Sequence, residues 1–120
     1  MKLSPERRQA LRVLWAALLG LVVYGSWLPP NSEILNTLAL ISDKLMHFCA
    51  YTTLAFLPVL SFESRRRGII TGALMVLVGL LVEAGQSFVG RDVELGDVIA
   101  NTLGVCTGIA AGLPLRRRLR

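Results

Sequence analysis

The chain has 120 residues, a length that suits one domain, and 53% of them are hydrophobic, more than a soluble domain of this size needs. Its formal net charge of +5 at pH 7 could indicate a nucleic-acid-binding protein. However, the arginines cluster beside apolar stretches and do not line an amphipathic face. We therefore exclude nucleic acid as a partner and expect lipid to be the main solvent of this chain.

The first predicted helix begins at a capping motif. Ser4 offers the capping hydroxyl, Pro5 suits the first helical position, and Glu6 places an acid near the positive end of the helix dipole. The apolar stretch that follows predicts a first membrane span at about residues 11–28, which a pair of prolines ends.

A short amphipathic segment and a second span follow. Residues 31–41 carry apolar side chains at helical spacing, which predicts a short helix along the outer membrane interface. Ser42 is the expected cap of the next helix, and the second span is predicted at about residues 44–61. Pro58 falls near its far end, where a missing backbone hydrogen bond is most easily tolerated.

Two further apolar stretches complete the chain. Residues 69–89 predict a third span that buries the carboxyl group of Glu83 in its outer half, and residues 97–114 predict a fourth span that ends at Pro114. We therefore predict an all-α integral membrane protein, in which residues 1–120 form a single domain with a four-helix bundle.

Small residues in the fourth span predict how it packs. Gly104, Gly108 and Gly112 recur every fourth residue and let another helix approach closely. We expect this contact to lie within one chain and to give the fourth span a central position.

Cys49 and Cys106 show the spacing of neither a disulfide nor a metal site, and we expect both to be ordinary buried side chains.

The basic residues predict the orientation of the spans. With the amino terminus inside, only Lys44 and Arg91 of the 13 lysines and arginines lie outside, and the other eleven are cytoplasmic. The opposite orientation would place the arginine clusters across the membrane, against the charge bias that normally directs insertion. We therefore predict that both termini are cytoplasmic.

Polar side chains gather at the outer ends of the last three spans, at intervals of three or four residues that place them on shared helix faces. They are Asp43, Lys44, His47 and Tyr51 in the second span, Glu83 and Gln86 in the third, Arg91 after it, and Asp97 and Asn101 in the fourth. Charged groups are costly inside a membrane and persist where they pair or function, so this set is the predicted functional site.

The chemistry of this set is proton transfer and anion binding. A histidine can act as acid, base or nucleophile, carboxylates can orient it or hold a cation, and lysine and arginine can bind phosphate oxygens. Membrane lipids offer the nearest anionic head groups. Asp43, Glu83 and Asp97 could also hold a hard divalent cation, but their spacing matches no recognised metal motif, so metal and cofactor stay unknown.

Several of these residues also have a structural interpretation. Asp43 and Asp97 lie near helix starts, where they could cap backbone N–H groups. His47 could be a hydrogen-bonded side chain of the interface, and Tyr51 could serve packing alone.

Glu83 needs a partner at its depth in the third span, and Arg91 is the natural candidate. Glu94, in contrast, is expected to be a solvated surface charge.

Three motifs, in this order, resemble the signature of the VanZ-like family. They are Asp43-Lys44-x-x-His47-Phe48-x-x-Tyr51, Glu83-x-x-Gln86-x-x-x-x-Arg91 and Asp97-x-x-x-Asn101-x-x-Gly104-x-x-x-Gly108. The resemblance covers residues 43–108, and the chain is similar to a minimal member of the family. Related sequences often carry proline where Val89-Gly90 stands here, a departure that affects only the expected loop shape.

The resemblance implies a bacterial inner-membrane protein. The family takes its name from resistance to the glycopeptide teicoplanin, and it has been related to enzymes that process lipid head groups or polyprenyl-linked envelope intermediates. The implied reaction is at a phosphoester or pyrophosphate linkage. The alternative is a non-catalytic protein that binds a lipid or the antibiotic, or that supports an envelope complex. A transporter is disfavoured, because the chain lacks evident inverted repeats.

Each motif residue has an expected role under the catalytic interpretation. His47 is the acid, base or nucleophile, and Asp43 orients it. The remaining roles are phosphate binding by Lys44 and Arg91, and tuning of the site or cation binding by Glu83 and Asp97. Gln86 and Asn101 are expected to bind the substrate through fixed hydrogen bonds, and Tyr51 is the remaining substrate-binding candidate. The sequence leaves the oligomeric state open.

Overall fold

The computed structural model describes residues 2–28, 43–90 and 93–120, except for the side chain of Asp43. The described residues are all-α and form no strands. The helices are α1 (Pro5–Ser26), α3 (Asp43–Ser61), α4 (Arg65–Gln86), the short 3-10 helix η1 (Ser87–Val89) and α5 (Leu95–Leu119). The interfacial helix expected at residues 31–41 and the expected cap Ser42 lie outside the described residues.

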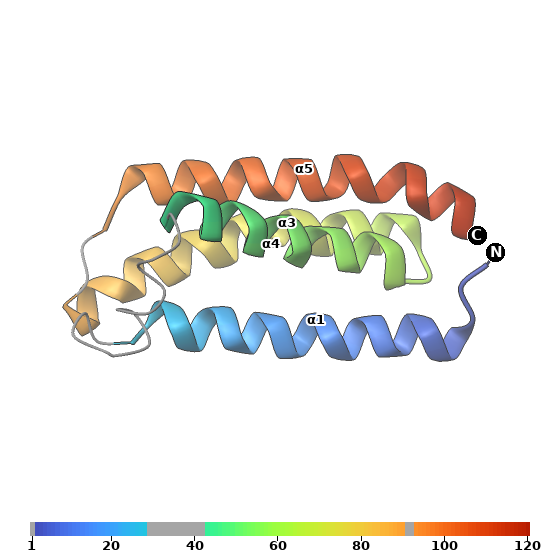
Figure 1. The fold of residues 1–120 in the computed structure, drawn as a ribbon, viewed down its shortest axis with the longest axis horizontal. Helices are drawn as coiled ribbons and strands as arrows, with labels where there is room; N and C mark the ends of the chain where they lie inside the picture. Colours follow the sequence, from blue (N-terminus) through green and yellow to red (C-terminus); the bar gives the residue numbers. More distant parts are fainter. Residues whose placement is uncertain (1, 29–42, 91–92) are drawn as a thin grey trace.

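The four α-helices run up and down along one long axis (Figure 1). Both termini and the connection between α3 and α4 lie at one end, and the connection between α4 and α5 lies at the other. The principal-axis extents are 46 × 24 × 23 Å, so the long dimension exceeds the roughly 30 Å hydrocarbon core of a bilayer.

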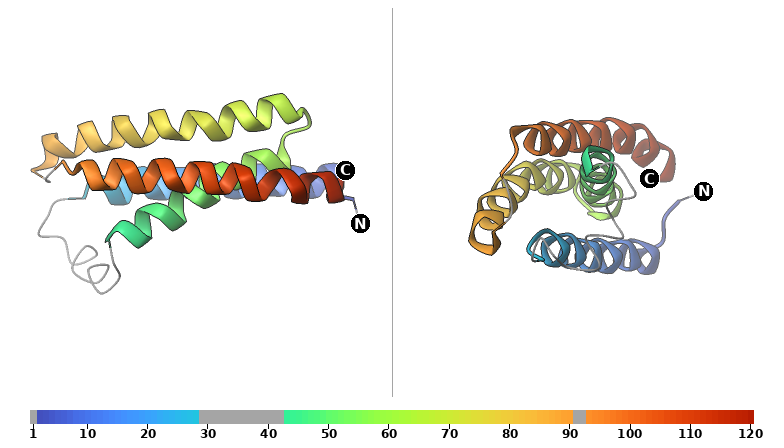
Figure 2. Two further views of the ribbon diagram at one scale, coloured as in Figure 1. Left: turned by 90° about the horizontal axis from the view of Figure 1, so that it is seen from above. Right: turned by 60° about the vertical axis from the view of Figure 1, so that its left-hand side comes forward.

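The central helix is α3. It contacts α1, α4 and α5, and Figure 2 shows it lying among them. The expectation that the fourth span is central is therefore wrong. Residues 57–61 of α3 are all buried, because the neighbouring helices cover its second half.

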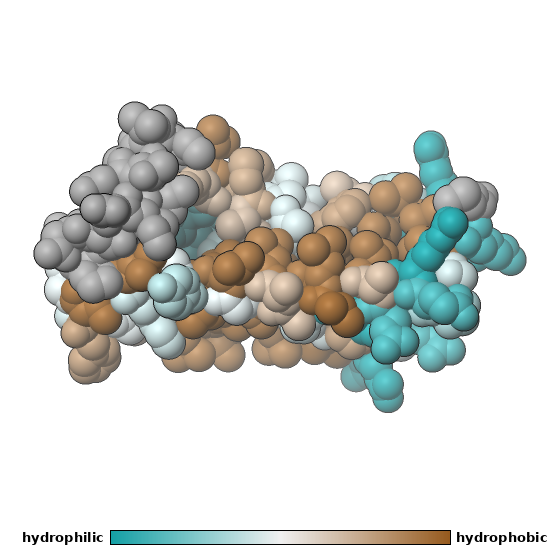
Figure 3. Space-filling view, turned by 60° about the horizontal axis from the view of Figure 1, so that its bottom comes forward, coloured by the Kyte–Doolittle hydropathy of each residue, from teal (hydrophilic) through white to brown (hydrophobic). Residues whose placement is uncertain are grey.

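The bundle exposes many large apolar side chains and buries several polar ones beside its hydrophobic core, unlike a typical soluble protein. Leu21 on α1, Leu81 on α4 and Leu103 on α5 are each more than half exposed, whereas Glu83 and Asn101 are both 2% exposed. Figure 3 shows hydrophobic residues over the middle of the molecule and hydrophilic residues at one end. Among the described residues, three helices are long and apolar enough to cross a membrane: α1, α4 continued through η1, and α5.

Both cysteines also lie on this surface. Cys49 and Cys106 are free and exposed, so the expectation that they are buried is wrong. An apolar surrounding sequence does not imply an inward-facing side chain when the outer surface of the protein is itself apolar.

The first helix begins as the sequence predicts. The Oγ of Ser4 accepts the backbone N–H of Arg7 at 3.2 Å, and Pro5 is the first helical residue. No residue of α1 is fully buried, and Trp15, Leu18, Leu19 and Val22 on this helix pack partly buried against the core.

Pro58 lies inside α3 without ending it, as expected. Proline has no backbone N–H, so the carbonyl of Leu54 loses its usual helical donor. The indole Nε1–H of Trp15 on α1 donates to this carbonyl at 2.9 Å. The proline thus creates an acceptor through which α1 is bonded to the central helix.

Glycines bring α5 into backbone contact with α3, which confirms the predicted packing within one chain. A Cβ atom at Gly104 would lie 2.6 Å from the carbonyl oxygen of Phe48, and one at Gly108 would lie 2.2 Å from that of Thr52. Both distances are shorter than real Cβ atoms show, so only glycine permits this approach.

The last turns of α5 hold the carboxyl end of α3. The helix continues through Pro114 to Leu119, beyond the predicted end of the span. Arg116 and Arg120 donate from their guanidinium groups to main-chain carbonyls at 2.7–2.8 Å. The acceptors are the carbonyl groups of Val59, Leu60, Phe62 and Glu63. The positive charges thereby compensate the negative end of the α3 dipole.

We predict that Trp15→Phe lowers the free energy of unfolding by about 1–3 kcal/mol, because the carbonyl of Leu54 then lacks its donor. In a Pro58→Ala background the same substitution should have a smaller effect, since the alanine supplies the missing N–H. Thermal unfolding in detergent micelles, followed by circular dichroism, measures both differences. An equal loss in the two backgrounds would contradict the compensation.

Candidate functional site

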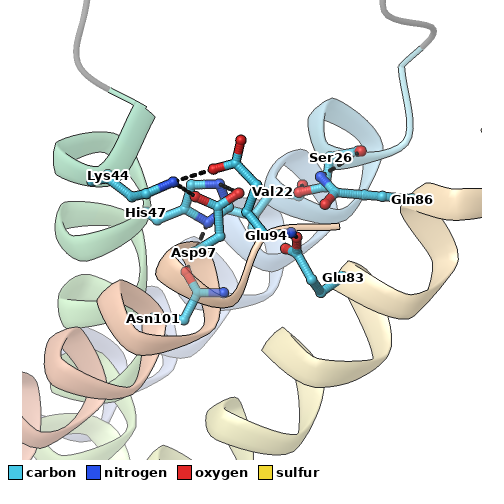
Figure 4. A network of polar contacts seen from close by, with 9 residues as sticks. All are labelled: Val22, Ser26, Lys44, His47, Glu83, Gln86, Glu94, Asp97 and Asn101. Carbon is cyan, nitrogen blue, oxygen red and sulfur yellow. Dashed lines mark hydrogen bonds and ion pairs between the residues drawn. The ribbon is translucent and has the colours of Figure 1, made fainter. Parts of the chain in front are cut away.

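The polar cluster lies at the end of the bundle opposite the termini, where α3 and α5 begin and α4 ends (Figure 4). Its described members are Lys44, His47, Glu83, Gln86, Glu94, Asp97 and Asn101. Gly90 has φ 78°, a left-handed conformation that glycine adopts readily, and it ends η1 before the chain enters α5.

Lys44 pairs with two carboxylates. Its Nζ donates to Oδ1 of Asp97 at 2.5 Å and to the carboxylate of Glu94. The Asp97 side chain is 6% exposed, while those of Lys44 and Glu94 are 45% and 54% exposed. The ion pairs therefore extend from the interior of the bundle to its surface. Asp97 lies in the first turn of α5, where its charge also favours the helix dipole.

The imidazole ring of His47 contacts two side chains of α5. Its Nδ1 lies 2.8 Å from Oδ1 of Asn101, and because the amide oxygen accepts, Nδ1 carries the proton and donates. Nε2 lies 3.7 Å from Oδ2 of Asp97. A ring held in this way can take up a proton at Nε2, and the carboxylate is placed to compensate the resulting positive charge.

Glu83 is buried, as the sequence predicts, but its described partner is one that the sequence did not indicate. Its Oε1 accepts the backbone N–H of Glu94 at 2.9 Å. This N–H belongs to the cap residue of α5, where the helix dipole is positive. Arg91 lies outside the described residues, so its pairing with Glu83 stays a prediction.

Gln86 points from α4 toward Ser26 at the end of α1 (Figure 4). Its Nε2 donates to the carbonyl oxygen of Ser26 at 3.0 Å, and nearby the Nε1 of Trp27 donates to that of Val82 at 3.1 Å. The amide of Gln86 thus links α4 to α1. Its expected role in substrate binding stays a prediction.

Tyr51 lies deeper in the bundle and is 1% exposed, within the hydrophobic core. Its hydroxyl and the Nδ2 of Asn101 are buried and have no hydrogen-bond partner among the described residues. A Cβ atom at residue 79 would lie 3.1 Å from Asn101 Nδ2 and 3.2 Å from Tyr51 Cε1. Gly79 therefore leaves the space that both side chains need. Because Gly79 and Glu83 are four residues apart and share a helix face, the sequence could have indicated this role.

Part of the predicted set lies outside the described residues. The side chain of Asp43 is outside the described part of the chain, and with it lie the predicted contact with His47 and the metal trio that includes Asp43. Within the described residues, no group of three or more histidine, cysteine, aspartate or glutamate side chains is arranged to hold a metal ion.

These features define a class: an all-α protein with membrane-spanning helices and a cluster of ionisable side chains at one end. A family model described as VanZ/LLP1 matches residues 7–115, so the chain belongs to the VanZ/LLP1 family and the resemblance of its motifs is confirmed. Comparison with curated proteins and with solved structures finds no match.

We predict that the two carboxylates on Lys44 contribute unequally to stability. Asp97→Asn removes a charge-assisted hydrogen bond at a nearly buried position and should lower the free energy of unfolding by about 1.5–3 kcal/mol. Glu94→Gln is the matched control at an exposed position, with an expected loss of about 0–1 kcal/mol. Unfolding in mixed micelles with increasing denaturing detergent compares them, and equal losses would argue against this division.

Proposed function

We propose that the chain is a four-span protein of the bacterial inner membrane whose outer polar cluster binds the phosphorylated head group of a lipid and acts on its phosphoester or pyrophosphate linkage. The observation that carries this proposal is the imidazole of His47. Asn101 fixes its tautomer, Asp97 faces its other nitrogen, and the partly exposed cation Lys44 lies beside it.

Charge supports the proposed orientation, with both termini in the cytoplasm. The arginines at residues 65–67 and 117–118 are exposed at the end that carries the termini. Positive charge of this density normally stays on the cytoplasmic side during insertion. The polar cluster then faces the outer leaflet, where phospholipids and polyprenyl-linked envelope intermediates present phosphate groups.

The fourth span in this arrangement is α3, which is not one of the three described helices that meet the requirement of length and apolar composition for crossing a membrane. Its first turns carry Lys44 and His47, and its second half is covered by neighbouring helices. A helix enclosed in this way needs less apolar side-chain surface than one that faces lipid.

A hydrolytic reaction at this site would use His47 as a general base. Water attacks phosphorus, Nε2 takes the proton of the water, and the bond between phosphorus and the leaving oxygen breaks. The imidazolium then returns the proton to the leaving oxygen. Lys44 binds the phosphate oxygens, and Asp97 compensates the charge of the protonated ring.

A non-catalytic role is the second candidate, favoured by the hydrogen bond that joins His47 on α3 to Asn101 on α5. In that case the polar cluster locks the helices together. The protein would then bind a lipid or a glycopeptide antibiotic such as teicoplanin, or support an envelope complex, without turnover.

Two substitutions of His47 distinguish these roles. The amide of His47→Asn can donate to Asn101 from the position of Nδ1 but cannot transfer a proton, whereas His47→Ala loses both properties. Catalysis predicts that His47→Asn keeps the melting temperature of the wild type and lowers turnover by about 100-fold or more. The assay uses purified protein and labelled phospholipids and polyprenyl pyrophosphates, with and without divalent cations.

The non-catalytic role predicts a different result. If no labelled lipid is converted by folded wild-type protein, and only His47→Ala lowers the melting temperature, the polar cluster has the locking role.

A further inference from the structure

The outer surface of the polar cluster carries neighbouring charges of opposite sign. Lys44 and Glu94 are ion-paired, and both side chains are about half exposed. Asp97, the second partner of Lys44, is almost buried. One ammonium group and one carboxylate therefore face outward side by side, with His47 next to them (Figure 4).

The exposed ion pair favours a head group that carries both charges over one that carries negative charge alone. Lys44 and Glu94 are in direct contact, so a ligand that reaches one of them also reaches the other. A phosphate that approaches Lys44 also approaches the carboxylate of Glu94, and like charges at such short range repel. A purely anionic head group therefore satisfies only the lysine.

Each charge has an exposed apolar neighbour in the sequence. Leu45 follows Lys44 and is 54% exposed, and Leu95 follows Glu94 and is 75% exposed. The end of the bundle that carries the ion pair thus also exposes apolar side chains, as expected for a site that meets a molecule with a charged head and hydrocarbon chains.

We infer that the lipid head group taken by this site is zwitterionic, with a phosphate beside a primary ammonium group, as in phosphatidylethanolamine. The inference rests on the proposed function and specifies its substrate class. The phosphate pairs with Lys44 and the ammonium group with Glu94, while Asp97 keeps its bond to the lysine. An exposed ion pair is weak, so little is lost when the Lys44–Glu94 pair opens, and two new pairs form in its place.

Competition between two short-chain lipids tests this inference. Folded wild-type protein in detergent micelles is offered equal amounts of dihexanoyl phosphatidylethanolamine and dihexanoyl phosphatidylglycerol, and bound lipid is counted by native mass spectrometry. We expect the zwitterionic lipid to bind about tenfold more tightly. Glu94→Gln should abolish this preference and Glu94→Lys should reverse it, whereas Glu63→Gln, at the arginine-rich end, should leave it unchanged.

The outcomes separate this inference from the proposed function. Two results would overturn the inference that the head group is zwitterionic while leaving lipid binding intact. The first is equal or tighter binding of phosphatidylglycerol by the wild type, and the second is a preference for phosphatidylethanolamine that persists in Glu94→Gln and Glu94→Lys. Binding of neither lipid by protein that circular dichroism shows to be folded contradicts the proposed function itself.

Discussion

A bilayer offers no hydrogen bonds to the groups that it surrounds, so polar groups in the membrane-spanning part of a chain must find partners within that chain. Several contacts of this bundle follow from that constraint. Trp15 donates to the carbonyl that Pro58 leaves without a helical partner, and the arginines near the end of α5 donate to the last carbonyls of α3. The buried carboxylate of Glu83 accepts a backbone N–H at the start of α5.

These contacts fix α3 relative to α5 along its whole length, which is what places the histidine. Glycines allow the two backbones to touch in the middle, and guanidinium groups hold the carboxyl end of α3. At the other end, Asp97 and Asn101 hold Lys44 and His47. The same network therefore stabilises the fold and holds the largely buried imidazole of His47 in place beside the exposed Lys44. Substitutions have to be chosen to separate stability from chemistry.

The sequence predicted the helices of this fold better than the hydrogen bonds between them. Apolar stretches and the Ser4 cap located the helices, the depth of Glu83 predicted its burial, and the glycine repeat predicted close packing within one chain. Partners between helices depend on crossing angles and on backbone atoms, which side-chain periodicity does not report. The sequence therefore missed the backbone N–H that Glu83 accepts and the bond from Gln86 to α1.

We propose that the polar cluster and the arginine-rich end lie on opposite sides of the membrane, with the cluster outside. Phe88→Cys and Arg66→Cys place thiols at exposed sites at the two ends, each in a Cys49→Ala, Cys106→Ala background. A maleimide that cannot cross the inner membrane is added before or after that membrane is opened. We expect residue 88 to react while the membrane is intact and residue 66 to react only after it is opened. The reverse pattern, or equal reaction of both thiols, would contradict the proposed orientation.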